Sequence, residues 1–315
     1  MPVDIPFDVI CIGRLGIDLY PEQIGVSLAE VKTFSKSLGG SPTNVAVGLA
    51  KLGRRVALFS GVGEDGFGDY AKSELESYGV KATWVRQYSG HRTPMVFASI
   101  FPPDNFPMLF YRDVPAPDEL VETRDLDRGA ITQARLLWVT GGSLAVEPVR
   151  TAVLSALSWR KNKDSILDLD WRPSQWSAVS NPAEYFRSAM VLANTIIGNE
   201  EEYCRATGTQ DIDSAISVVE GLGAKTIVVK KGPNGVMGKQ SGGDWTSILP
   251  RKTDVICGLG AGDAFGAAFM HGKLANWPLE KCLKLANVAG SIVASRLHCA
   301  AAMPQLSELE AAVAE

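Results

Sequence analysis

Short apolar runs rich in β-branched residues alternate with segments of helical periodicity along most of this 315-residue chain. Strands are expected at residues 9–12, 56–60, 136–140, 165–169, 190–193 or 195–197, and 226–229. Helices are expected at residues 43–52, 67–78, 147–161, 182–188, 199–206, 211–222, 263–275, 279–296 and 305–313. Continuous apolar strands separated by helices indicate a mostly parallel sheet that is covered on both faces. The alternation therefore predicts a doubly wound α/β fold.

Two segments interrupt this alternation. Residues from about 15 to 37 and from about 92 to 114 read as extended chain joined by turns such as Pro102-Pro103-Asp104-Asn105. We expect them to form a small antiparallel sheet outside the main one. No low-complexity or hinge-like stretch divides the chain, so we expect a single domain over residues 1–315 that carries this small sheet.

Composition and charge exclude several classes of protein. The net charge is −4 and Lys/Arg runs are missing, which argues against a nucleic-acid or membrane partner. No apolar stretch approaches the roughly 20 residues of a membrane span, and the first residues do not resemble a secretory signal. The five cysteines are widely spaced and the three histidines are scattered, which predicts reduced thiols and no zinc site. The sequence thus predicts a cytoplasmic protein.

A glycine turn near the C-terminal end, Gly260-Ala261-Gly262, delivers Asp263 into the first turn of an apolar helix. The first N–H groups of a helix lack helical partners, and the helix dipole adds roughly half a positive charge there. An anion is therefore expected to bind at residues 260–263. Asp263 stands beside that position as a proton acceptor for an alcohol. A donor nest next to a carboxylate base suits phosphoryl transfer to a hydroxyl.

A second glycine turn, Gly39-Gly40-Ser41-Pro42-Thr43-Asn44, leads into another helix whose Val45, Leu49 and Leu52 share one face. The two stretches together resemble the paired signatures of the ribokinase-like (PfkB) carbohydrate kinases. The resemblance extends over essentially the whole chain. It implies an ATP- and Mg²⁺-dependent kinase, and it implies that the small sheet is a lid over the sugar and a contact between subunits of a homodimer or larger homo-oligomer.

The resemblance also assigns a sugar site. Asp18 follows the first strand, at the edge of the sheet where ligands of open α/β folds bind, so its carboxylate could bridge two sugar hydroxyls. Gly39, Gly40 and Asn44 are implied to join it. Asp263 is implied to be the catalytic base, beside an anion hole formed by Gly260, Ala261 and Gly262.

Two arginines point to the substrate class. Arg172 lies in Asp168-Leu169-Asp170-Trp171-Arg172-Pro173, which resembles the family's Asp-x-Asn-x-Arg-Pro segment, and Arg112 closes the second lid segment. Guanidinium groups bind a planar carboxylate with two parallel hydrogen bonds. Members of the resembled family that act on keto-deoxy sugar acids tend to carry arginines at these two positions, so the resemblance implies such a substrate. Several segments are most similar to the family branch of inositol catabolism. A kinase for 2-keto-3-deoxygluconate and a fructokinase- or ribokinase-type enzyme remain alternatives.

The nucleotide site is assigned by further motifs of the family. Asn199 and Glu202 match its Asn-x-x-Glu motif, which helps to hold Mg²⁺ through water. Lys230, Gly232 and Gly235 match the segment that borders the nucleotide, and Asn287 is implied to line the adenine pocket. The chain departs from the family where Cys257-Gly258-Leu259 replaces the usual Asp-Thr-Thr. This weakens any expectation of an activating monovalent cation.

Two other functional classes remain open. Gly61-Val62-Gly63-Glu64-Asp65-Gly66 matches the Gly-x-Gly-x-x-Gly pattern of NAD-dependent oxidoreductases. It follows the second core strand, however, and the acidic residue expected about 20 residues later is missing. A tight turn at the edge of a sugar pocket explains it better. The other class is a non-catalytic sugar or nucleotide sensor, against which the presence of Asp263 argues.

Overall fold

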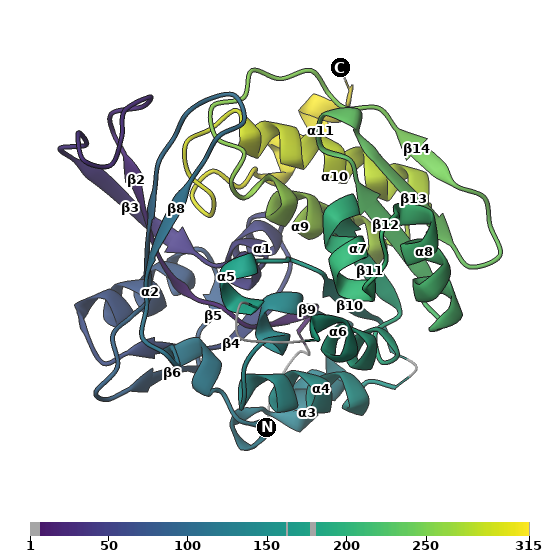
Figure 1. Cartoon of the computed structure of the whole chain (residues 1–315), viewed down its shortest axis with the longest axis horizontal. Coiled ribbons are helices and arrows are strands. Elements are labelled where there is room, and N and C mark those ends of the chain that lie inside the picture. The colour runs from purple at the N-terminus through teal and green to yellow at the C-terminus, as the bar shows by residue number, and fades with distance from the viewer. Residues whose placement is uncertain (1–6, 162, 177–180, 315) are drawn as a thin grey trace.

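The computed structural model describes residues 7–161, 163–176 and 181–314. Within them a ten-stranded sheet forms the centre of the molecule, in the order β14-β13-β12-β11-β10-β9-β1-β4-β5, with β6 also paired to β4 (Figure 1). Its strands are β1 (Val9–Ile12), β4 (Val56–Gly63), β5 (Val80–Lys81), β6 (Val85–Tyr88), β9 (Leu136–Thr140), β10 (Ser165–Asp168), β11 (Thr195–Asn199), β12 (Thr226–Lys230), β13 (Val236–Gln240) and β14 (Thr246–Ile248). Among the described strands of this sheet, only the β12–β13 and β13–β14 pairs are antiparallel. The predicted doubly wound α/β fold is confirmed.

Helices cover both faces of the sheet, because alternate residues of each strand point to opposite sides. Val9 and Cys11 of β1 join one hydrophobic core, whereas Ile10 and Ile12 join the other. The first core includes residues of α1 (Ser41–Lys51), α2 (Gly66–Ser77), α9 (Ala261–Leu274), α10 (Leu279–Ala294) and α11 (Leu306–Ala314). The second includes residues of α3 (Arg128–Gln133), α4 (Val149–Trp159), α6 (Pro182–Met190), α7 (Glu200–Thr207) and α8 (Ile212–Gly221). Short helical turns complete the chain: α5 (Pro173–Trp176), η1 (Pro117–Leu120), η2 (Thr123–Asp125), η3 (Gly141–Leu144) and η4 (Gly232–Asn234).

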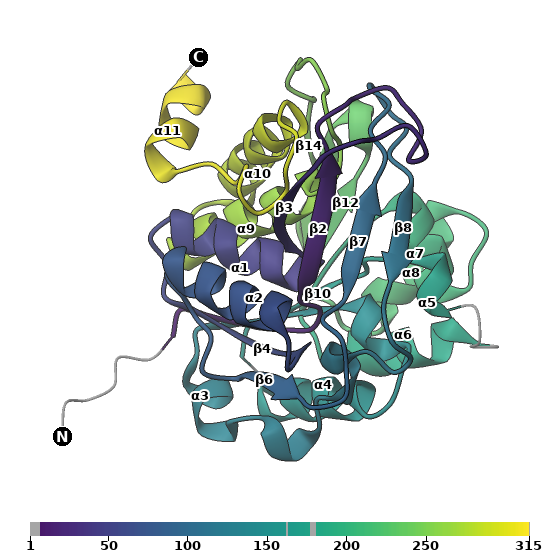
Figure 2. The same cartoon turned by 90° about the vertical axis from the view of Figure 1, so that its left-hand side faces the viewer.

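The two interrupting segments form a separate four-stranded sheet, the lid. It has the order β3-β2-β7-β8, with β2 (Gly16–Pro21), β3 (Phe34–Gly39), β7 (Met95–Ala98) and β8 (Met108–Tyr111). Figure 2 shows these strands side by side, apart from the main sheet. The β2–β3 and β7–β8 pairs are antiparallel, but β2 and β7 run parallel. The expectation of a purely antiparallel sheet was therefore wrong at the pairing that joins the two segments.

The observed bounds of the helices and strands lie within a few residues of the expected ones. The structure also decides between the two candidates for the fifth strand. Of the two candidates for the fifth strand, Thr195–Asn199 forms β11, whereas Met190 ends α6. Met190 is buried together with Phe186 and Ala189, whereas Val191 is 58% exposed directly after α6, so this apolar run begins at the end of a helix and forms no strand. In the described part of the chain, no helix is both long and apolar enough to cross a bilayer.

A buried arginine at the edge of the second core forms hydrogen bonds with several backbone carbonyls. Arg160 follows α4 and is only 1% exposed. Its guanidinium donates to the carbonyl oxygens of Ile131 and Ala134 at 2.7 Å, and to those of Arg135 and Asp164 at 3.0 and 2.7 Å. Burial lowers its pKa to about 10, so it remains charged at neutral pH. It ties the turn after α3 to the turn before β10.

Candidate active site

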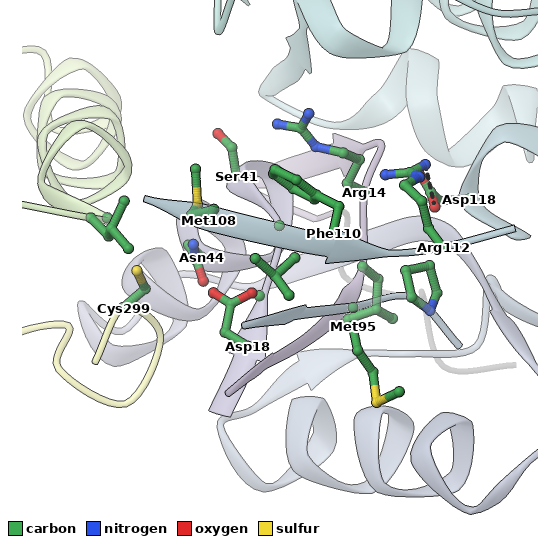
Figure 3. A pocket seen from close by; sticks show the side chains of 18 of the residues that line it. Arg14, Asp18, Ser41, Asn44, Met95, Met108, Phe110, Arg112, Asp118 and Cys299 are labelled. Carbon is green, nitrogen blue, oxygen red and sulfur yellow. Dashed lines mark hydrogen bonds and ion pairs between the residues drawn. The ribbon is translucent and has the colours of Figure 1, made fainter. Parts of the chain in front are cut away.

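The lid and the carboxyl end of β1 enclose a cavity of about 90 Å³ together with the N-terminal ends of α1 and α9. In the view of Figure 3, Arg14 and Arg112 lie on one side of this cavity, and Asp18, Asn44 and Cys299 lie on the other. All residues predicted for sugar binding line it, together with two of those predicted for catalysis: Asp18, Gly39, Gly40, Asn44, Arg112, Arg172, Gly260 and Asp263. The fold thus brings both glycine turns to one place.

The glycine turn Gly260-Ala261-Gly262 builds the start of α9. Gly260 has a φ of 80°, in the left-handed region that glycine adopts without strain. A Cβ at this position would lie 2.7 Å from Sγ of Cys299, so a side chain is also excluded by packing. Within the described residues, the N–H groups of Gly262 and Asp263 have no hydrogen-bond acceptor on the chain. These two N–H groups lie at the positive end of the helix dipole, a position that favours an anion.

A hydrogen bond joins Asp263 to Asn44, which follows the other glycine turn, Gly39-Gly40. The amide Nδ2 of Asn44, from the first turn of α1, donates to Oδ2 of Asp263 at 2.8 Å. Burial raises the pKa of Asp263, and the nearby Asp170 adds to that shift, whereas the hydrogen bond from Asn44 and the charge of Arg172 oppose it. A carboxylate with a raised pKa holds a proton more readily, which suits a general base.

Asp18 lies on β2, against the backbone of β3. A Cβ on Gly39 would lie 2.0 Å from Oδ1 of Asp18, so the carboxylate fits only because residue 39 is glycine. Burial raises the pKa of Asp18 to about 7, and the hydroxyl of Tyr20 opposes this by donating to Oδ2 at 3.3 Å. The same hydroxyl is 2.8 Å from Sγ of Cys299. Asp18 is therefore a half-buried acceptor that lines the cavity.

Arg172 is held by the carboxylate of Asp170, which lies 3.0 Å from its Nε. The charge of Asp170 raises the pKa of Arg172 above its usual value. Asp170 itself has a φ of 33°, a left-handed conformation that aspartate and asparagine tolerate better than other residues with side chains. This conformation accounts for the exchange of the family's asparagine for aspartate at this position.

Arg112 follows β8 of the lid and contacts η1, which lies outside the lid. Its Nη2 lies 3.2 and 3.3 Å from the two carboxylate oxygens of Asp118 and 2.8 Å from Oε1 of Glu119, both in η1. Asp118 also lines the cavity. The two carboxylates raise the pKa of Arg112 against the effect of burial.

Arg14 is a cavity residue that the sequence reasoning missed. It follows β1, forms an ion pair with Asp170, and donates from Nη1 to Gln175. The available signal was its place directly after the first strand, the same argument that singled out Asp18. Asp170 therefore bridges Arg14 and Arg172, two arginines that both line the cavity.

A second cavity of about 690 Å³ adjoins the first across the start of α9. Ala261 and Gly262 line the second cavity, whereas Gly260 and Asp263 line the first. Four residues predicted for nucleotide binding line it as well: Lys230, Gly232, Gly235 and Asn287. Pro103 and Asp104, from the turn between β7 and β8, reach the same cavity. The predicted base and anion hole thus lie between the smaller cavity and the larger one.

Asn199 and Glu202 are not among the described residues that line either cavity. They cap α7: Oδ1 of Asn199 accepts from the N–H of Glu202 at 2.8 Å, and Oε2 of Glu202 accepts from the N–H of Asn199 at 2.7 Å. Glu202 nevertheless lies near the second cavity, because its Oε2 is 3.9 Å from Nζ of Lys230. The same Nζ is 3.3 Å from Oδ1 of Asp168, at the end of β10.

These groups fit a hydrated Mg²⁺ better than a metal held entirely by protein. Among the described residues no cluster of three or more His, Cys, Asp or Glu side chains could hold a metal ion. Asp168 and Glu202 are two carboxylates that approach the same ammonium group beside the second cavity. Magnesium keeps several waters and takes few protein ligands when phosphates are present, so a pair of carboxylates is sufficient.

The Gly-x-Gly-x-x-Gly segment has a structural explanation. Gly61 and Gly63 lie within β4, where an added Cβ would be 2.2 Å from the carbonyl oxygen of Pro117 and 2.4 Å from that of His91. Asp65 caps α2 and binds the N–H of Thr93, just before β7. The segment anchors the base of the lid, and it is not among the described residues that line the cavity beneath that lid.

Comparison with known proteins gives a consistent result. The model of the pfkB family carbohydrate kinases matches residues 7–306. The 5-dehydro-2-deoxygluconokinase of Shouchella clausii is 32% identical over 317 residues, covering 98% of this chain and 96% of its own. That of Bacillus subtilis is 32% identical over 310 residues, with coverages of 96% and 95%. A putative ribokinase II from E. coli, solved with ATP and Mg²⁺, has a TM-score of 0.89 at 19% identity, covering 98% of this chain and 99% of its own.

Proposed function

The chain belongs to the pfkB family of carbohydrate kinases, and from that premise we propose that it phosphorylates 5-dehydro-2-deoxy-D-gluconate to its 6-phosphate in myo-inositol catabolism, with ATP as donor. The names of its relatives, at about a third of positions identical over nearly the whole chain, support this substrate. The observation that carries it is the presence of Arg14, Arg112 and Arg172 around the cavity that also holds Asp18 and Asp263. A neutral sugar has no carboxylate for these guanidinium groups to bind.

The proposed reaction begins with the sugar acid in the smaller cavity. Asp18 and Asn44 orient its hydroxyls, the backbone of Gly39 and Gly40 forms the floor, and Arg112 closes the site from the lid. Asp263 accepts the proton of the acceptor hydroxyl as the oxygen attacks the γ-phosphorus. The backbone N–H groups at Gly260–Asp263 stabilise the negative charge that develops on the transferred group.

The proposed nucleotide site is the larger cavity. Gly232, Gly235 and Asn287 surround the nucleoside, and Lys230 lies beside the phosphates. Mg²⁺ would neutralise part of the phosphate charge there. Glu202 and Asp168 would hold its waters, and Asn199 would fix the position of Glu202 through their mutual hydrogen bonds.

A screen of acceptors tests the proposed function. We expect ATP consumption with 5-dehydro-2-deoxygluconate at a kcat/KM at least about 100-fold above that with fructose or ribose, because a neutral sugar leaves the arginines unpaired. Coupled measurement of ADP release, with 2-keto-3-deoxygluconate as a further acceptor, gives the ranking. An equal kcat/KM with neutral sugars would refute the sugar-acid proposal. A higher kcat/KM with 2-keto-3-deoxygluconate would identify that acid as the substrate instead.

We also propose that the protein is cytoplasmic and that two copies associate through the outer face of the lid. Val96 and Phe110 line the cavity, so strand alternation places Phe97, Leu109 and Tyr111 on the opposite face. Leu109 and Tyr111 are 48% and 57% exposed, and the rings of Phe97 and Tyr111 lie 5.4 Å apart. A continuous exposed apolar surface of this kind is typical of a protein–protein contact.

The oligomer prediction can be checked by sedimentation at micromolar concentration. We expect a dimer or larger assembly for the unchanged protein and a monomer for Leu109→Glu, because a buried, unpaired carboxylate at the contact costs several kcal/mol. Val191→Glu is the matched control, since Val191 is 58% exposed at the end of α6, outside the lid. Monomeric behaviour of the unchanged protein would exclude the lid contact.

A further inference from the structure

A tyrosine hydroxyl is buried beside Asp18. Tyr20 lies two residues further along β2, so its side chain points to the same face of the lid as that of Asp18. Tyr20 is 0% exposed and is not among the described residues that line the smaller cavity. Its ring packs in an apolar cluster with Ala98, Ile100, Cys257 and Cys299. A phenol in such surroundings needs hydrogen-bond partners within the protein.

Two side chains provide those partners. The hydroxyl of Tyr20 lies 3.3 Å from Oδ2 of Asp18 and 2.8 Å from Sγ of Cys299. Burial raises the pKa of the Tyr20 hydroxyl and that of the Cys299 thiol well above their usual values, so both groups keep their protons at neutral pH. A phenol has one proton to donate and an ionised carboxylate has none. With Asp18 ionised, all three groups are satisfied when the thiol donates to the phenol oxygen and the phenol donates to Asp18.

The ring of Tyr20 is held in place by the loop after α10. The imidazole of His298 lies edge-on to that ring, with the ring centres 5.0 Å apart. Nε2 of His298 is 2.8 Å from Oγ of Ser35, which is the direct partner of Tyr20 in the β2–β3 ladder. The hydroxyl of Tyr20 is therefore a donor in a fixed position, and a donor held in place needs no reorganisation when its acceptor binds a ligand.

The charge of Asp18 depends on this donor. Burial raises the pKa of Asp18 to about 7, and the hydrogen bond from Tyr20 is the strongest effect that opposes burial. Other titratable or charged groups also lie close enough to Asp18 to interact with it: Arg14, Arg172, Cys257, Asp263 and Cys299. An ionised carboxylate accepts hydrogen bonds at both oxygens, whereas a protonated one presents a donor in place of an acceptor. Binding of sugar hydroxyls by Asp18 at neutral pH thus requires the ionised form.

We propose that Tyr20 is a positioning residue for the acceptor: its hydroxyl donates to Asp18, and this bond keeps the carboxylate ionised and oriented to accept hydrogen bonds from the hydroxyls of the sugar. Tyr20 acts through Asp18, since it does not itself line the cavity. The inference rests on the proposed function, because it requires a hydroxyl-bearing acceptor in the smaller cavity, and it adds a residue that controls how that acceptor is bound.

The test is a cycle of Tyr20→Phe and Asp18→Asn, with the affinity for 5-dehydro-2-deoxygluconate measured by calorimetry between about pH 5.5 and about pH 9. Tyr20→Phe should weaken binding about 10-fold below about pH 7, the lower end of the range for a hydrogen bond to a charged group, because the 3.3 Å contact is long. The loss should fall below about threefold near pH 9, where Asp18 is ionised in both proteins. In the Asp18→Asn background the same change should have less than about a threefold effect at every pH. At saturating acceptor, kcat should stay within about threefold.

A matched control removes another buried hydroxyl. Tyr203 is 0% exposed and donates to the carbonyl oxygen of Ile196 at 2.8 Å. Tyr203→Phe should lower the melting temperature without changing how acceptor affinity depends on pH. If Tyr20→Phe does not fold, fluorotyrosine at position 20 replaces it: this residue has nearly the same shape and is a stronger donor, so the pH dependence should move to lower pH.

The outcomes separate this inference from the proposed function. A loss of affinity that is equal at every pH, or one that persists in the Asp18→Asn background, would overturn the role of Tyr20 while leaving the kinase activity in place. If the unchanged protein neither binds nor phosphorylates a sugar acid or a sugar, the proposed function is refuted, and this inference fails with it.

Discussion

Replacing Asp263 with asparagine is expected to lower kcat by about 10²- to 10⁴-fold, because the amide keeps the shape of the carboxylate and cannot accept a proton. The affinity for ATP should change little, since the proposed anion site is built from backbone N–H groups that the substitution leaves in place. Single-turnover measurement of phosphoryl transfer, with ATP binding measured separately, checks both parts. A variant with near-normal turnover would exclude Asp263 as the base.

The same variant should be more stable than the unchanged protein at alkaline pH. Burial raises the pKa of Asp263, so its stabilising effect is present below the unfolded value and is lost as pH rises through the folded value. Asparagine removes this loss, so the gain in melting temperature should grow as pH rises above the unfolded value of about 4. Asp8→Asn is the control of opposite sign, because the pKa of Asp8 is lowered, with Arg55 as its hydrogen-bonding and charge partner.

Replacing Arg160 with methionine is expected to lower the free energy of unfolding by about 3–5 kcal/mol, the range for removing one partner of a buried charged network. Methionine fills a similar volume but leaves the carbonyl oxygens of Ile131 and Ala134 without their donor. In a chain of this size the melting temperature should fall by about 5–8 °C.

Two further variants show whether this loss of stability comes from the charge of Arg160 or from its hydrogen bonds. Arg187→Met, at an exposed position of α6, should change stability by less than about 0.5 kcal/mol. Arg160→Lys should recover only part of the loss, because an ammonium has three donors and cannot reach carbonyls arranged around a planar fork. Full recovery with lysine would show that the charge, and not the set of hydrogen bonds, is what matters.

The arrangement of strands and helices could be predicted because the signals were local. The apolar runs of β1, β9 and β12 are long enough to identify them without reference to the rest of the chain. The glycine turns at 39–40 and 260–262 likewise indicate helix starts where a ligand is expected to approach the backbone closely. The site residues that followed from those turns, such as Asn44 and Asp263, lie within hydrogen-bond distance of each other.

Features that depend on distant partners could not be predicted in this way. Arg160 stands in a run of charged residues that reads as the solvated end of a helix, and only the carbonyls gathered around it show that it is buried. The pairing of Arg14 with Asp170 joins residues far apart in the sequence, and no local pattern marks it. The capping role of Asn199 and Glu202, by contrast, is visible in their three-residue spacing.

The hydrogen bond between Asn44 and Asp263 affects how the protein folds during its synthesis. During translation, α1 leaves the ribosome long before α9 is made, and domains fold as their chain becomes available. The part of the chain that carries Asp18, Asn44 and Arg112 is therefore synthesised before the proposed base, the proposed anion hole and much of the proposed nucleotide site exist. A nascent chain can thus begin to build its sheet without consuming ATP, and it becomes a catalyst only when α9 packs against α1.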